Sequence, residues 1–440
     1  MNDLTISQST QFEIIDLSIV TKVNTLSIQG IFQEINIFDS VLNPCMSGTI
    51  LIQDATNMVS NFLFDGSESL NIKIGKDKDT ISIDKSFRIY KMTDRKNDNM
   101  TSQSYVLHFI SDEMVLSKQQ KVSHFFQTTY AQTAVQILNQ YLKVPYTRMY
   151  GTFDDSIGTK DILVPNLNPI DAIMWCAQRA IDKKKVPGFL FFENKLGYNF
   201  TSISSLFEQK PAFNINFDPK NIDTNSNDIL GARSFEVVED FNLLKNIENG
   251  VYSGQFVGFD TVSRTIVRRN FSFGDHYDMY KHMNPGPNAG ATVNALGYNI
   301  EQTESCVYYH PFSAPRADIS LIRQNDPASL SKLLDTENYI YQRRAIMNNI
   351  FGKKVKLVMP GNFALSSGFV VGLTVPTYGI KDRTDDNLDN SLHGNYMLSA
   401  VRHIITYNKH ETVVEAVTDS SNKTNSGAMI RASNRQATLA

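Results

Sequence analysis

The residues of this chain that could bind a metal ion are His276, His282, Cys306 and His310, which lie in one stretch rich in tyrosine, glycine and proline. Imidazole nitrogen and thiolate sulfur are ligands that zinc accepts. Their spacing fits no familiar zinc pattern, and histidines among tyrosines are more typical of a hydrogen-bonding contact surface. We therefore predict no cofactor and no metal site, and keep a zinc hydrolase as the outlying alternative.

Other residue types that could support catalysis occur without the context that catalysis requires. The carboxylate pairs Asp154-Asp155 and Asp385-Asp386 lie in polar segments beside Gly, Thr or Asn, as in exposed turns. The run Lys183-Lys184-Lys185 follows an apolar helical pattern, and positive charge is favoured at a helix end. The sequence has no phosphate-binding loop, dinucleotide fingerprint, His-Glu-x-x-His motif or nucleophile elbow. We predict that the protein is not an enzyme and assign no catalytic, cofactor-binding or metal residues.

Composition and charge narrow the protein class further. The 440 residues are 41% hydrophobic and 20% charged, which is ordinary for a globular protein, and the 27 Phe and 18 Tyr favour strands. A formal net charge of -3 argues against a dedicated binder of nucleic acid or anionic membranes. The three cysteines, the polar N-terminus and the lack of a long apolar run predict folding in a reducing cytoplasm without membrane insertion.

A repeat at a spacing of 206 residues organises the chain. Segments 35–54 and 241–260 match in their apolar positions and share five identical residues: Asn36 and Asn242, Asn43 and Asn249, Ser47 and Ser253, Gly48 and Gly254, Asp54 and Asp260. The shared pattern is an apolar strand, a turn at Asn-Pro or Asn-Gly, and a Ser-Gly entry into a second apolar strand. It predicts the same β-hairpin twice, with a glycine needed at each turn, and hence a duplicated structural unit.

Residues 1–115 alternate apolar strands with polar turns. The strand patterns cover 25–33, 48–53, 69–74, 87–92 and 105–110. Charged turn formers at 75–79 and 94–98 suit exposed hairpin ends. This region is predicted to form a first antiparallel β-barrel.

Residues 116–217 are predicted to form a small α/β domain. Apolar residues in 128–141 recur at helical spacing, and Asn168-Pro169 supplies an N-cap and a first helical residue for a second helix. That helix carries Trp175, which we interpret as a core residue. Strands at 189–193 and 196–200 then form a hairpin across Asn194-Lys195.

The second barrel is predicted to be split into 218–273 and 353–419. Strands at 355–359, 369–375, 396–406 and 411–418 repeat the order of the first barrel, with Ser366-Ser367-Gly368 in the place of Asp65-Gly66. Between its parts lies an inserted loop-rich domain, 274–352, with a long helix from Asp326-Pro327 to Gly352. Residues 420–440 lack aromatic residues and are predicted to form a flexible tail. The predicted fold class is α+β, mainly β.

With these elements in order, the chain resembles the central baseplate hub proteins of contractile-tail phages (myoviruses), relatives of the late control gene D proteins and of the base of type VI secretion spikes. The resemblance covers nearly the whole chain up to about Asp419. It is carried by the order of these segments: Phe38-Asp39-Ser40-Val41-Leu42-Asn43-Pro44, Ser47-Gly48-Thr49-Ile50, 168–175, 394–403 and 411–419. Spike proteins of the family continue into an oligosaccharide-binding barrel, a lysozyme domain or a β-helix, so the resemblance implies that piercing belongs to another protein.

The resemblance implies a structural subunit of a virion tail baseplate that is assembled in the host cytoplasm. Three subunits with two similar barrels each would form a pseudo-sixfold ring between the sixfold tail tube and the threefold central spike. The implied partners are further copies of the chain, the tail tube protein, the central spike protein, other baseplate proteins and, as a further candidate, the tape measure protein. DNA would pass only in transit through the lumen. The alternatives are the base of a secretion-system spike and a receptor-binding tail β protein.

Overall fold

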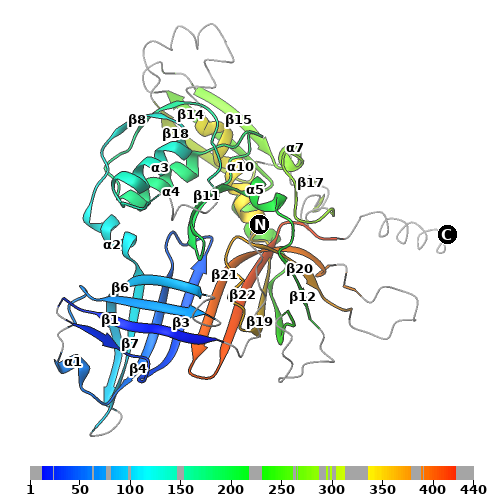
Figure 1. The fold of residues 1–440 in the computed structure, drawn as a ribbon. Helices are drawn as coiled ribbons and strands as arrows, with labels where there is room; N and C mark the ends of the chain where they lie inside the picture. Colours follow the sequence, from blue (N-terminus) through cyan, green and yellow to red (C-terminus); the bar gives the residue numbers. More distant parts are fainter. Residues whose placement is uncertain are drawn as a thin grey trace.

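The computed structural model describes residues 12–22, 24–61, 64–75, 81–97, 101–145, 153–217, 230–260, 264, 266–286, 294–295, 298–299, 304–312, 335–377, 388–389 and 391–422. Most strands of this part join one 13-stranded sheet, with smaller sheets and a few helices packed beside it (Figure 1). The predicted α+β, mainly β class is confirmed.

The first half of the large sheet is antiparallel and runs in the order β3-β4-β7-β6-β5-β1-β2. Alternation of buried and part-exposed side chains is regular in β7, as expected for a sheet with one buried face. The inward side chains of six of these strands form one apolar cluster, to which the short helix α1 (Met58–Asn61) adds Met58. The strands are β1 (Glu13–Val20), β2 (Thr25–Ser27), β3 (Phe32–Ser40), β4 (Ser47–Asp54), β5 (Ser69–Gly75), β6 (Ile81–Asn97) and β7 (Gln103–Ser111).

The second half has its own apolar cluster and runs in the order β13-β19-β22-β21-β20-β12. All neighbours pair antiparallel except β12 and β20, which pair parallel. The two halves meet where β3 pairs with β21, from Ser40 opposite Ala400 to Glu34 opposite Thr406. The strands are β12 (Phe213–Asn216), β13 (Ser234–Glu239), β19 (Lys353–Pro360), β20 (Val370–Thr374), β21 (Gly394–Thr406) and β22 (His410–Thr418).

Both halves follow the same strand path. The order β3-β4-β7-β6-β5-β1 in the first corresponds to β13-β19-β22-β21-β20-β12 in the second. The directions differ only at the end of the path, where β1 pairs antiparallel with β5 but β12 pairs parallel with β20. A bulge between Ile89 and Lys91 of β6 recurs between Leu398 and Ala400 of β21. The turns before β5 and β20 also correspond, because each contains a glycine with positive φ, Gly66 and Gly368. The equivalence of these two turns, predicted from the sequence, therefore agrees with the strand path.

The prediction that segments 35–54 and 241–260 form the same hairpin, however, is wrong. The strand that occupies the position of β3 is β13, and the strand that occupies the position of β4 is β19, which comes more than a hundred residues after β13. Residues 249–260 instead follow the helix α6 (Leu243–Glu248) and form β14 (Ser253–Asp260), which belongs to a separate sheet. A turn followed by an apolar strand specifies a strand locally, but it does not specify which sheet the strand joins.

Residues 112–208 pack as helices and short strands around a further apolar cluster. Helix α3 starts after Thr129, whose side chain accepts a hydrogen bond from the backbone of Gln132, and α4 starts at Pro169 after Asn168, as predicted. Trp175 is partly buried against this cluster. The elements are α2 (Asp112–Gln119), α3 (Tyr130–Gln140), α4 (Pro169–Arg179), α5 (Ile203–Glu208), β8 (Phe125–Thr128), β9 (Lys160–Leu163), β10 (Phe189–Asn194) and β11 (Gly197–Ser202).

The remaining elements lie above the large sheet in Figure 1. Strand β14 pairs antiparallel with β15 (Ile266–Ser272) and parallel with β18 (Val307–Phe312). Helix α10 (Asp335–Ile350) packs on this sheet, where the Tyr341 hydroxyl donates to the carbonyl oxygen of Gln255 at 2.7 Å and lies 3.0 Å from that of Cys306. Three short elements complete the list: α7 (Gly274–Tyr277), β16 (Asn294–Ala295) and β17 (Tyr298–Asn299). No helix in this described part is long and apolar enough to cross a membrane.

The structure differs from the sequence-based prediction at the end of α4. This helix ends at Arg179, so the run 183–185 lies in the following turn and not at the helix end. The predicted start of the long helix at Asp326-Pro327 lies outside the described residues. Residues 420–440 are predicted to form a flexible tail, but Ser420 is buried and its hydroxyl accepts from the backbone of Asn284 at 2.7 Å. The domain boundaries given above stay a prediction.

The prediction that Gly48 is needed for backbone freedom at a turn is wrong. A glycine is needed there because neighbouring atoms leave no room for a side chain. It lies inside β4 without a positive φ, and a Cβ atom there would lie 2.2 Å from the Phe109 ring and 2.3 Å from the Asn36 carbonyl oxygen. We predict that Gly48→Ala lowers the free energy of unfolding by about 1–3 kcal/mol in urea titrations. The matched control is Gly30→Ala, because a Cβ atom at Gly30 meets nothing within 4 Å. Equal denaturation midpoints for the two variants would contradict this account.

Candidate assembly site at the junction of the two half-sheets

The junction between the halves combines backbone pairing with side-chain contacts from one arginine. Arg402 of β21 donates through Nε to Asn36 Oδ1 at 2.9 Å. Its guanidinium lies 5.5 Å from the centre of the Phe38 ring and 3.9 Å from the Glu34 carboxylate. These groups are partly exposed, so each contact contributes little by itself. The backbone ladder supplies the main attraction, and Arg402 favours one register.

The end of β10 inserts a buried carboxylate beneath the first half. Glu193 is 1% exposed and accepts hydrogen bonds from Ser111 Oγ at 2.5 Å and from the backbone of Met46 at 3.0 Å. It also forms an ion pair with Lys85 of β6. A carboxylate can be buried at this depth because a cation and two donors surround it. Glu193 thus ties the α/β segment to β4, β6 and β7.

The next two residues, the last of β10 and the first of the turn to β11, bind the second half. Asn194 donates from Nδ2 to the carbonyl oxygen of Ser367 at 3.1 Å. Lys195 donates from Nζ to the carbonyl oxygens of Phe363 and Ala364 at 2.7 and 2.8 Å. Three consecutive residues therefore hold both half-sheets, and this end of the β10–β11 hairpin fixes their relative position.

Asp39 at the end of β3 adds a buried anchor across the junction. It accepts hydrogen bonds from the Ser366 hydroxyl and from the backbone of Ser367 at 3.1 Å. Burial raises the pKa of Asp39 to about 6, although these hydrogen bonds and the charge of Lys195 act in the opposite direction. Burial likewise lowers the pKa of Lys195 to about 8, against the attraction of Asp39. Near neutral pH the two side chains carry opposite charges across the junction.

Two buried histidines lie close to these anchors. Their ring nitrogens, Nδ1 of His403 and Nε2 of His410, are 3.2 Å apart, and the His410 ring stacks on Phe363 at 3.9 Å between ring centres. Burial lowers the pKa of His403 to about 3 and the pKa of His410 well below its usual value. Both rings are neutral at pH 7 and are 5% and 3% exposed, so they fill the core and do not face a substrate.

Three of the four side chains that the sequence singles out as possible metal ligands have other partners. His276 Nδ1 lies 2.8 Å from the Ser272 carbonyl oxygen, and His282 Nδ1 lies 2.7 Å from the Asp419 carboxylate. Cys306 Sγ accepts from Arg344 at 3.8 Å, and the backbone of His310 lies opposite Gly258 in β18. Among the described residues, no group of three His, Cys, Asp or Glu side chains could hold a metal ion.

The carboxylate and lysine runs are distributed over surface contacts. Asp154 accepts from Thr201 Oγ1 and from the backbone of Ser202, both at 2.7 Å, and so caps the end of β11. Asp155 pairs with Lys183 at 3.7 Å in an exposed ion pair. Lys184 pairs with Glu208. Asp385-Asp386 lie outside the described residues. The sequence analysis missed Asp39, Glu193, Lys195 and His403, although Glu193 gives a signal, since it follows four consecutive apolar residues in a strand.

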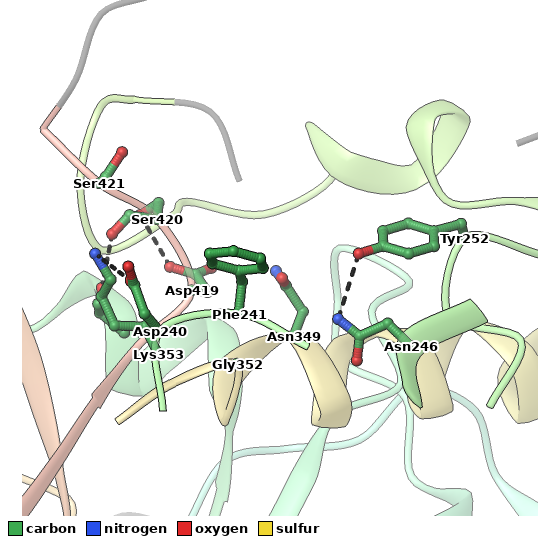
Figure 2. Close-up of a pocket in the computed structure, with 11 residues that line it drawn as sticks. Asp240, Phe241, Asn246, Tyr252, Asn349, Gly352, Lys353, Asp419, Ser420 and Ser421 are labelled. Atoms are coloured by element: carbon green, nitrogen blue, oxygen red, sulfur yellow. Dashed lines mark hydrogen bonds and ion pairs between the residues drawn. The ribbon is translucent and has the colours of Figure 1, made fainter. Parts of the chain in front are cut away.

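A small cavity lies beside the end of β13. It has a volume of about 30 Å³, enough for about one water molecule. Asp240, Phe241, Lys353 and Asn349 are among its lining residues, and Asp240 pairs with Lys353 at 3.0 Å across it (Figure 2). The cavity is too small for a substrate. The ion pair between Asp240 and Lys353 holds the chain in place just after β13.

The sheet formed by β14, β15 and β18 has an exposed apolar face. Phe259 and Ile266 lie opposite each other and are 43% and 58% exposed, and Tyr309 of β18 is 73% exposed. Exposed aromatic and aliphatic groups together are typical of protein contact surfaces.

No family model and no curated protein sequence matches the chain. Several solved structures resemble the chain. A tail protein from Neisseria meningitidis MC58 is 11% identical, with a TM-score of 0.48 over 92% of this chain and 96% of that one. The 43 kDa tail protein of prophage MuSo2 from Shewanella oneidensis is 6% identical, with a TM-score of 0.51 over 92% and 98%. A type VI secretion component from E. coli is 8% identical, with a TM-score of 0.42 over 94% and 78%. At these identities the likeness concerns the fold alone: the chain shares its fold with a phage tail protein along nearly its whole length.

Loss of the Glu193 carboxylate should destabilise the fold strongly. The Lys85 side chain is 14% exposed and would lose its charge partner inside the protein. We predict that Glu193→Ala lowers the free energy of unfolding by about 3–5 kcal/mol in urea titrations. The control is Asp155→Ala, which breaks the exposed pair with Lys183 and should cost at most about 0.5 kcal/mol. A similar small loss in both variants would contradict a structural role for the buried pair.

The pKa of Asp39 predicts a pH dependence of stability. Because burial raises this pKa from 3.8 to about 6, the folded state retains a proton that the unfolded state has lost between about pH 4 and pH 6. The free energy of unfolding of the wild type, minus that of Asp39→Asn, should therefore decrease as pH rises through this window and stay constant above about pH 7. Urea titrations over the pH range measure it. A difference that is constant, or that increases with pH, would contradict the raised pKa.

Proposed function

We propose that this chain is a structural hub subunit of a contractile phage tail baseplate. Three copies would form a ring with pseudo-sixfold symmetry that joins the sixfold tail tube to the threefold central spike. The lumen of the ring would let DNA pass without binding it, in keeping with the net charge of -3. The protein would act as a component of the virion tail, after assembly in the host cytoplasm.

The observation that carries this proposal is the repeated strand path within one continuous sheet. A chain with two similar halves presents the same surface twice, so three chains present it six times. A tail tube with sixfold symmetry then meets six near-equivalent sites, whereas a threefold spike meets three identical chains. The shared fold with a phage tail protein supports a place in a tail.

The remaining surfaces suit partners of different kinds. The exposed apolar face of β14, β15 and β18 has the aromatic and aliphatic character of a protein interface and would contact other baseplate proteins. The two half-sheets would contact the tail tube protein on one side of the ring and the central spike protein on the other. The tape measure protein is a further candidate partner along the lumen.

Mass measurement and imaging test the ring directly. Light scattering after size exclusion, with the chain alone and with a candidate tube protein, should give three copies per particle, because each chain supplies two of six positions. Electron microscopy of these particles should show a ring with six similar lobes. A chain that stays monomeric in both samples, or an elongated fibrous trimer, would contradict the hub function and favour a receptor-binding tail protein in the second case.

A further inference from the structure

We infer that neighbouring copies of this chain join by pairing β13 of one copy with the free part of β6 of the next, in the register in which β3 pairs with β21 inside one chain. This inference rests on the proposed ring and specifies the contact that closes it. It follows from comparing the edges of corresponding strands in the two halves.

Strand β21 has both edges occupied. One edge pairs with β22, and the other is divided between β20, at Gly394 to Met397, and β3, at Ala400 to Thr406. Strand β6 has the same arrangement in its first part, where β5 covers one edge up to Arg88. Beyond that point β6 pairs with β7 alone within the described residues, so the edge from Tyr90 to Asn97 lacks the partner that β3 gives to β21.

Strand β13 also has one edge without a partner strand in the described residues. Its counterpart β3 pairs with β4 on one edge and β21 on the other, whereas β13 pairs with β19 alone in the described part of the chain. Unpaired strand edges readily accept another strand. The two free edges cannot meet within one chain in this sheet, since β13 ends the sheet order and β6 lies seven strands away. A second copy of the chain can bring them together.

The internal junction also gives the register of the new pair. Inside one chain, Phe38 of β3 lies opposite Arg402 of β21, and Asn36 lies opposite Ile404. The corresponding pairs between two copies are Glu239 of β13 with Thr93 of β6, and Glu236 with Lys96. Compared with β3, strand β13 contains one extra residue between Val237 and Glu239. Compared with β21, strand β6 contains one extra residue between Thr93 and Lys96, at the corresponding position. Because the extra residues fall at the same step, pairing continues in register on both sides of them.

The charges of the two edges are complementary. Residues 91–97 carry three cations, Lys91, Arg95 and Lys96, with one acid, whereas residues 234–240 carry three acids and no cation. The register places Glu236 directly against Lys96, and opposite charges at such positions stabilise strand pairs. The internal junction uses the same chemistry, with Arg402 beside Glu34.

Exposed apolar side chains flank the same edges. Val238 is 52% exposed and Phe241 is 69% exposed on the β13 side, and Tyr90 is 52% exposed on the β6 side. Continued past Glu239, the register brings Phe241 beside Tyr90. The ion pair between Asp240 and Lys353 holds the chain in place just before Phe241 (Figure 2). Pairing would therefore bury apolar surface at one end and match charges at the other.

Cross-linking through paired cysteines tests the register. The full-length chain carries Glu236→Cys and Lys96→Cys in a Cys306→Ser background, since Cys45 and Cys176 are buried. A short bismaleimide linker should give covalent dimers and trimers, because directly opposite residues have Cβ atoms about 5 Å apart. The matched control pairs Glu236→Cys with Lys91→Cys, which lies about 15 Å further along the strand. Equal cross-linking in both, or none in either, overturns the inference.

Charge reversal gives an independent measurement of the same contact. Glu236→Lys with Glu239→Lys, and separately Arg95→Glu with Lys96→Glu, should each weaken trimer formation about tenfold. The chain that carries all four changes should recover most of the loss, which a merely structural effect would not produce. Thermal melting of each variant checks that it folds. A wild-type trimer that neither cross-links at the matched pair nor responds to reversal overturns this contact but keeps the ring, whereas a wild type that never forms a trimer overturns both.

Discussion

The antiparallel pairing of β3 with β21 is the interaction on which the rest of the structure depends. It joins two half-sheets, each with its own apolar core, into one continuous sheet. Backbone hydrogen bonds can form between any two strands, so they do not determine which strands pair. The specific position comes from the buried polar groups around the junction, above all Glu193 and Lys195 at the end of the β10–β11 hairpin and Asp39 at the end of β3.

These buried charges also explain why the α/β segment is part of the same structural unit. A carboxylate or an ammonium group is expensive to bury unless its partners are in place. Glu193 finds its partners on the first half and Lys195 on the second, so the two halves and the turn must be correctly placed together. The neutral histidines His403 and His410 fill the space beside them without adding charge.

Duplication gives the described part of the chain one paired junction between its halves and two strand edges without a partner. Within the chain, the first half supplies β3 and the second supplies β21. The corresponding β13 ends the sheet order, and β6 lacks a second neighbour beyond Arg88 in the described residues; the two strands carry opposite net charge. An open sheet with complementary edges is a unit that can close into a ring through copies of itself, whereas identical edges would give a twofold pair. The proposed hub function and the proposed contact both follow from this asymmetry.

The sequence by itself determined the individual elements, because periodic burial and local turn chemistry are properties of short segments. It correctly predicted the mainly β class, the start of α4 at Pro169, the hairpin of β10 and β11, and the equivalence of the turns at Gly66 and Gly368. It misassigned 249–260, because β14 carries the same local pattern as β4 but pairs in another sheet. The junction and its anchors were decided only by the tertiary structure, because the hydrogen-bond and ion-pair partners of Asp39, Glu193 and Lys195 come from segments far apart in the chain, and only the fold brings them together.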